Sequence, residues 1–123
     1  MKESDFNSRI NKKLDPTRIK SWKILDPFQG GVPDNFYCSN GGHIMPNSTP
    51  LFVEYKMIKA LPKRETTIIK PNLSAQQLEW LQMLRHTCCH TWVIIGVASV
   101  EGSHAAMGYI MNDPDEWVTG VTA

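Results

Sequence analysis

The sequence has few features of an exported or membrane-bound protein. None of its apolar runs approaches the roughly 20 residues of a membrane span, and its first residues contain no apolar signal core. We therefore expect a cytoplasmic protein with no membrane partner, in the host cell's cytoplasm if the chain is encoded by a bacteriophage. Only three cysteines are present and two of them are adjacent, so the sequence lacks a disulfide framework and we expect reduced thiols.

The sequence also lacks repeats and low-complexity linkers, and its 123 residues suffice for one hydrophobic core. We expect a single domain over residues 1–123. The net charge is only +1, but it is unevenly distributed. Twelve Lys and Arg against seven Asp and Glu give residues 1–72 a net charge of +5, whereas one Arg against five acids gives residues 73–123 a net charge of −4. A basic first half suits a polyanionic substrate, although solvated charged loops explain it equally well.

Hydrophobic periodicity and local signals predict alternating helices and strands. We expect a helix over 3–14, a strand over 35–38, and an antiparallel neighbour of that strand over 51–57. A helix over 74–87 and a strand over 91–98, apolar enough to be covered on both faces, should follow. Weaker signals mark an extended segment at 66–69, a last strand at 104–111 and a helical turn at 113–118, while 17–32 reads as either a strand or a loop. The fold class is α/β, with a mixed central β-sheet flanked by helices.

The helix over 74–87 has the clearest start. Ser74 and Gln77 have the spacing of a capping box, and Leu73 and Leu78 that of a hydrophobic staple.

The strand over 51–57 carries charges where a buried strand should be apolar. Side chains alternate along a strand, so Phe52, Glu54 and Lys56 share one face. Buried charges are costly unless they pair or bind something, and this pattern therefore indicates a site. The alternative is a surface ion pair between Glu54 and Lys56 on an edge strand.

Three motifs in order resemble the PD-(D/E)XK nucleases. They are Gly31-Val32-Pro33-Asp34, Val53-Glu54-Tyr55-Lys56 and Leu73-Ser74-Ala75-Gln76-Gln77-Leu78-Glu79-Trp80-Leu81, and the similarity covers roughly residues 30–98. The resemblance is greatest to virus-type replication-repair nuclease (VRR-NUC) domains and to archaeal Holliday-junction resolvases. It implies a restriction-endonuclease-like core and a Mg²⁺-dependent endonuclease, with Mn²⁺ able to substitute, that acts on DNA, and by analogy on branched DNA.

The resemblance also assigns roles to individual residues. Asp34 and Glu54 would bind the metal together with the Tyr55 backbone carbonyl, and Lys56 would orient water or stabilise developing charge. Gln77 is a further catalytic candidate, although the capping box alone explains it.

The first helix in this family often carries an acid as well. Glu3 is the candidate here, with Asp5 as a second choice, although both acids also suit the start of a helix.

Some assignments are less direct. Lys59, Lys63, Arg64 and Lys70 are expected to contact nucleic acid, and the site is expected at one edge of the sheet. Cutting both strands of a junction suggests a two-fold homodimer, for which the apolar candidates are Trp92, Ile94, Val97, Trp117 and Val118.

Two rival functions stay open. One is a module of the same fold that binds nucleic acid without cutting it. The other is an interaction protein stabilised by zinc, with ligands drawn from Cys38, His43, His86, Cys88, Cys89 and His90, although no Cys-x-x-Cys pair supports it.

Overall fold

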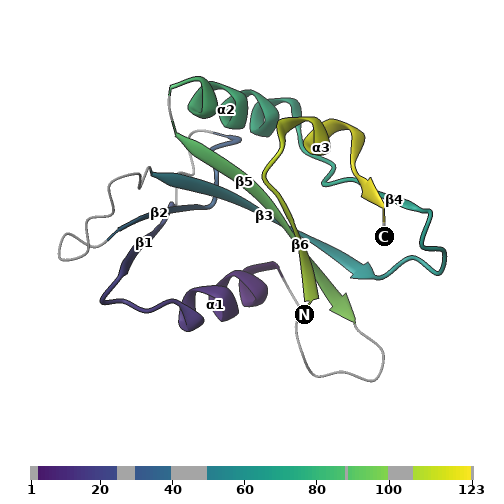
Figure 1. Cartoon of the computed structure of the whole chain (residues 1–123), viewed down its shortest axis with the longest axis horizontal. Coiled ribbons are helices and arrows are strands. Elements are labelled where there is room, and N and C mark those ends of the chain that lie inside the picture. The colour runs from purple at the N-terminus through teal and green to yellow at the C-terminus, as the bar shows by residue number, and fades with distance from the viewer. Residues whose placement is uncertain (1–2, 25–29, 40–49, 88, 100–106, 123) are drawn as a thin grey trace.

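The computed structural model describes residues 3–24, 30–39, 50–87, 89–99 and 107–122 (Figure 1). Its elements are α1 (Glu3–Lys13), β1 (Ile19–Lys23), β2 (Asn35–Ser39), β3 (Leu51–Ala60), β4 (Ile68–Ile69), α2 (Ala75–His86), β5 (His90–Ser99), β6 (Met107–Met111), α3 (Pro114–Thr119) and β7 (Val121–Thr122). None of the helices in these ranges is long and apolar enough to cross a membrane.

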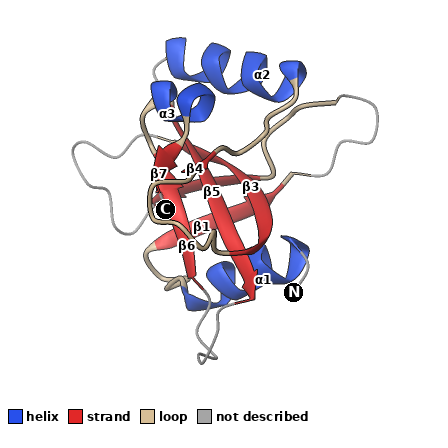
Figure 2. Cartoon of the chain, turned by 90° about the vertical axis from the view of Figure 1, so that its right-hand side faces the viewer, coloured by secondary structure: helices blue, strands red, loops and turns tan. Residues whose placement is uncertain are grey.

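The central sheet has five strands in the order β1-β2-β3-β5-β6. Strands β3 and β5 are parallel and joined through α2, whereas the other three pairs are antiparallel. Helices α2 and α3 cover one face and α1 covers the other, as Figures 1 and 2 show. The predicted mixed sheet flanked by helices is therefore confirmed. Strands β4 and β7 form a separate antiparallel pair, and β7 was not predicted.

The sheet separates two apolar cores, and β5 contributes to both. Val93 and Ile95 face α2 and α3, where they pack with Leu81 and Trp117. Ile94 faces α1, among the residues that pack around Phe6. This arrangement confirms that β5 is covered on both faces, as its uninterrupted apolar run predicted.

The local signals at the helix starts are also confirmed. Ser74 caps α2 in a complete capping box with Gln77. Asp113 caps α3 with Pro114 in its first turn, and Trp117 fixes this short helix by donating from Nε1 to the Met111 carbonyl at 2.9 Å.

The predicted position of the site at a sheet edge is wrong, because β3 is the middle strand of five. The order of strands depends on pairings between distant segments, which the local pattern around Glu54 does not encode. A central position also excludes the edge-strand ion pair as the explanation for Glu54, whose side chain is only 3% exposed.

Helix α1 is anchored to the sheet by one ring and one buried amide pair. Phe6 lies over Gly96, where an added Cβ would come within 2.6 Å of Phe6 Cδ1. Next to it, Asn7 Nδ2 donates to Asn35 Oδ1 at 2.7 Å, and both asparagines are buried. The glycine thus makes the hollow that lets α1 approach the sheet closely.

We expect Gly96→Ala to destabilise the fold by about 1–3 kcal/mol, because the methyl group would push Phe6 and α1 off the sheet. Chemical denaturation measures this. The control is the same change in a Phe6→Ala background, where space is available and the added cost should largely disappear. Equal costs of Gly96→Ala in the two backgrounds would contradict the proposed anchor.

Candidate active site

Asp34 and Glu54 are brought together by the register of β2 and β3. The ladder pairs Asn35 with Val53, so one further step along both strands sets Asp34 opposite Glu54. There the Asp34 carboxylate replaces backbone pairing, because its Oδ2 accepts a hydrogen bond of 2.8 Å from the Tyr55 N–H. Two acids from distant parts of the sequence therefore meet at the start of β2.

The turn before β2 is packed beneath the start of α2. Gly31 has a φ of +87°, and a side chain there would come within 2.6 Å of the Gln76 backbone. Pro33 is buried, and the Asp34 carbonyl accepts a 2.7 Å hydrogen bond from the Ile24 N–H. The Gly-x-Pro-Asp sequence thus fixes the backbone from which the Asp34 side chain extends.

Glu54 is a buried acid next to a second acid. Its Oε1 accepts a 3.1 Å hydrogen bond from Gln77 Nε2, and its carboxyl also hydrogen-bonds to that of Asp34. Burial raises the pKa of Glu54 to about 8, repulsion by Asp34 adds to this rise, and the charge of Lys56 opposes both. Burial and the neighbouring charge therefore favour the protonated form of Glu54.

Asp34 is similarly shifted. Burial raises its pKa, while the hydrogen bond from the Tyr55 N–H and the charges of Lys56 and Lys23 lower it. No local signal in the sequence distinguishes Lys23 from the other lysines. It lies in β1, a strand with every residue exposed and no apolar alternation to reveal it.

Lys56 is half-buried two residues beyond Glu54, on the same face of β3. Its charge lowers the pKa of Asp34, Glu54 and Glu3. One ammonium group thus acts electrostatically on three carboxyl groups.

Glu3 lies in the first turn of α1, and its charge contributes to the raised pKa of Glu54. Partial burial raises the pKa of Glu3, and the charge of Asp34 raises it further. Asp5, the second choice, lines a different surface hollow together with Ser8, Arg9 and Lys12. The interaction between Glu3 and Asp34 links Glu3 to the candidate site.

Gln77 performs two tasks with one side chain. Its Oε1 accepts from the Ser74 N–H at 3.0 Å, which closes the capping box, while its Nε2 donates to Glu54. Gln77 can therefore cap α2 and hydrogen-bond to Glu54 at the same time.

Tyr55 contributes its backbone to the site and its side chain to the opposite core. In an antiparallel ladder the N–H and C=O of one residue face the same neighbour. Because the Tyr55 N–H points to Asp34, its carbonyl oxygen faces that side too. The phenol is buried toward α1, 2.6 Å from the Tyr37 hydroxyl.

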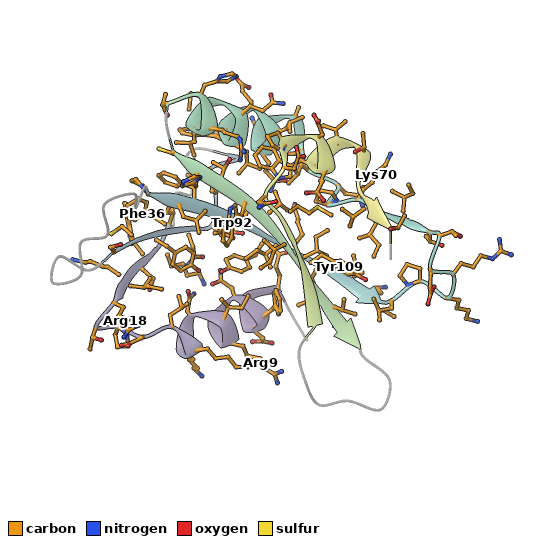
Figure 3. The ribbon with its side chains drawn as sticks, viewed as in Figure 1. Arg9, Arg18, Phe36, Lys70, Trp92 and Tyr109 are labelled. Atoms are coloured by element: carbon orange, nitrogen blue, oxygen red, sulfur yellow. The ribbon has the colours of Figure 1, made fainter. Side chains whose placement is uncertain are left out.

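The four basic candidates are exposed but differ in position. Lys70 and Lys56 line one cavity of about 160 Å³, together with Met57, Ile58, Pro71, Asn72 and Ile95. Figure 3 labels Lys70 beside β4. Lys59 lies near the end of β3, and Lys63 and Arg64 follow in the loop before β4, outside that lining.

The possible zinc ligands do not gather among the described residues, where no group of three or more His, Cys, Asp or Glu is placed to hold a metal ion. His43 and Cys88 lie outside the residues that the structure describes.

Comparison with known proteins yields a likeness of fold. No family profile and no curated protein matches the sequence. Among solved structures, the chain is similar to the Holliday junction resolvase Hjc of the archaeal hyperthermophile Archaeoglobus fulgidus. The two share 18% identity and a TM-score of 0.49, over 88% of this chain and 73% of the other. A likeness of this degree carries no argument about function.

The raised pKa of Glu54 predicts how stability depends on pH when divalent cations are absent. Between the ordinary pKa of a glutamate and about 8, the folded chain retains a proton that the unfolded chain has lost. Stability should therefore fall as the pH rises across that range. Thermal unfolding in EDTA should show this fall in the wild type and a shallower fall in Glu54→Gln. The exposed acid variant Glu79→Gln is the control and should follow the wild type. Parallel curves for wild type and Glu54→Gln would contradict the prediction.

Proposed function

We propose that this chain is a metal-dependent DNA endonuclease of the PD-(D/E)XK superfamily. The observation that carries the proposal is the pair formed by half-buried Asp34 and buried Glu54, with Lys56 on the same face of β3 as Glu54. Two neighbouring carboxyl groups whose pKa values are raised by burial destabilise a fold when both are ionised, unless a ligand compensates their charge. We therefore infer that the charge of Asp34 and Glu54 serves a function, which is to bind a cation.

The donor set fits a hard divalent cation. Mg²⁺ prefers oxygen ligands, commonly one or two carboxylates completed by water and substrate phosphate. Asp34 and Glu54 would hold it, the Tyr55 carbonyl faces the side on which it would lie, and Glu3 adds a further negative charge. Mn²⁺ fits the same ligands. When bound, such a cation lowers the pKa of a coordinated water and neutralises charge on a phosphodiester.

The remaining residues position groups for hydrolysis. Lys56 would orient the attacking water or stabilise the charge that develops on phosphorus as one P–O bond forms and the other breaks. Gln77 would orient the Glu54 carboxyl through its hydrogen bond to Oε1. Lys70, which shares a cavity with Lys56, would contact a neighbouring phosphate.

Branched DNA, such as a Holliday junction, is the substrate we propose, on the resemblance of the three motifs and the basic first half of the chain. A cleavage panel of duplex, single-stranded, flap and four-way junction DNA tests it. We propose a cytoplasmic location for this activity, in the host cell's cytoplasm if the chain is encoded by a bacteriophage.

A two-fold homodimer would present two identical sites to a junction. Ile94, Val97 and Trp117 are buried within the chain and are unavailable for this contact. Of the apolar candidates, Val118 is exposed and Trp92 half-buried, so the proposed contact narrows to these two.

Asp34→Asn and Glu54→Gln should each abolish Mg²⁺-dependent cleavage, since each removes a carboxylate ligand. Binding to junction DNA should be largely retained, as the basic residues are untouched. Gel-based cleavage and binding assays on one substrate measure both effects, with Glu79→Gln as an exposed control. Near wild-type cleavage by either variant would overturn the assignment.

Lys56→Ala should lower the turnover rate by about two or more orders of magnitude, the usual effect of losing one electrostatic donor. Its melting temperature should barely change, because Lys56 is only half-buried. Single-turnover kinetics separates this loss from weaker binding, and Lys13→Ala, which removes an exposed lysine at the end of α1, is the control. A large fall in stability with little loss of rate would favour a structural role.

A further inference from the structure

Three aromatic side chains form a row across β1, β2 and β3. Trp22 pairs with Phe36, and Phe36 pairs with Phe52, each directly opposite the next. Directly paired residues share one face of a sheet. The rings of Phe36 and Phe52 lie 5.2 Å apart between centroids and are tilted by 59°. We call these three residues the aromatic row; Figure 3 labels Phe36 toward the β1–β2 side of the sheet.

Packing within the described chain does not account for the aromatic row. None of its members belongs to either of the two apolar cores. Trp22 is 64% exposed, although tryptophan is highly buried on average in folded proteins. Because Trp22 is next to two further aromatic side chains, its exposed ring is part of a contiguous apolar surface, and such surfaces mark interaction sites.

The aromatic row is continuous with the candidate active site. Phe52 lies two residues before Glu54 on the same face of β3, roughly 7 Å along the strand. Trp22 is two strands away, roughly 10 Å across the sheet. The diagonal from Glu54 to Trp22 is therefore roughly 12 Å, which matches three to four stacked nucleotides at roughly 3.4 Å each. A strand whose phosphodiester reached Glu54 could therefore bring a nearby base over Trp22.

The surrounding charge favours a nucleic acid over a protein partner. Lys20 shares the face of Trp22, whereas Lys23 lies on the other face of β1, where its charge lowers the pKa of Asp34. Lysine is depleted at the centres of protein interfaces. Lysines beside exposed rings are typical of surfaces that bind single-stranded nucleic acid, where bases stack on the rings and the cations follow the backbone.

We propose that the aromatic row is a stacking platform for unpaired bases of a DNA strand held at the active site. The inference rests on the proposed nuclease function and makes its substrate class narrower: DNA with bases unpaired within a few nucleotides of the cleaved bond. Trp22 is the main stacking surface, and Phe36 and Phe52 support it.

Binding measured in EDTA tests the platform without requiring cleavage. The probe is a fluorescein-labelled oligodeoxythymidylate of about 12 nucleotides, within the usual site size, compared with an oligomer of equal length whose central nucleotides are abasic. Wild type should bind the thymidylate about tenfold more tightly, the usual effect of a stacked base. Trp22→Ala should lose this difference, and Trp22→Phe should retain most of it. The salt dependence of binding should be unchanged in Trp22→Ala but weaker in Lys20→Gln.

Ile110→Ala is the matched control, since Ile110 is 60% exposed on β6, at the other edge of the sheet. It should bind both oligomers as the wild type does. Equal affinity of the wild type for the two oligomers, or an equal loss for both in Trp22→Ala, overturns the platform. The platform is also overturned if Trp22→Ala turns a dimer into a monomer, as measured by light scattering, but still prefers the thymidylate to the abasic oligomer. A protein that shows the preference but cuts no DNA overturns only the nuclease function.

Discussion

The antiparallel register of β2 against β3 is the constraint on which the candidate site depends. It sets Asp34 opposite Glu54 and at the same time turns Tyr37, Val53 and Tyr55 into the core beneath α1. Because side chains alternate along a strand, a slip by one residue would bury Glu54 against α1 and expose Tyr55. The apolar face of the strand pair therefore fixes the register, and the fixed register brings the acids together.

Bringing two carboxyl groups together inside a protein has an electrostatic cost. Burial raises the pKa of both Asp34 and Glu54, and the charge of Asp34 raises that of Glu54 further, while the charge of Lys56 lowers both. The fold remains stable because large apolar cores lie on both faces of β5, the strand next to Glu54. The site thus holds negative charge that a cation can use, in a framework stabilised elsewhere.

The sequence predicted the parts of this arrangement that local chemistry specifies. The alternation from Phe52 to Lys56, the turn at Asp34 and the cap at Ser74 all have short-range signals, and the structure has each of them. It did not predict the central position of β3 or the contribution of Lys23. Strand β1 has no apolar alternation, and strand order is decided by pairings between segments far apart in the chain.

Gln77 shows how a structural signal and a functional one can occupy the same residue. A glutamate at this position would complete the capping box as well as a glutamine does. It would, however, place another carboxylate against Glu54. It would also remove the amide that donates a hydrogen bond from α2 to Glu54. The amide supplies an acceptor to the Ser74 N–H and a donor to Glu54 at the same time. The choice of glutamine over glutamate is therefore explained by the neighbouring acid, and the cap alone does not explain it.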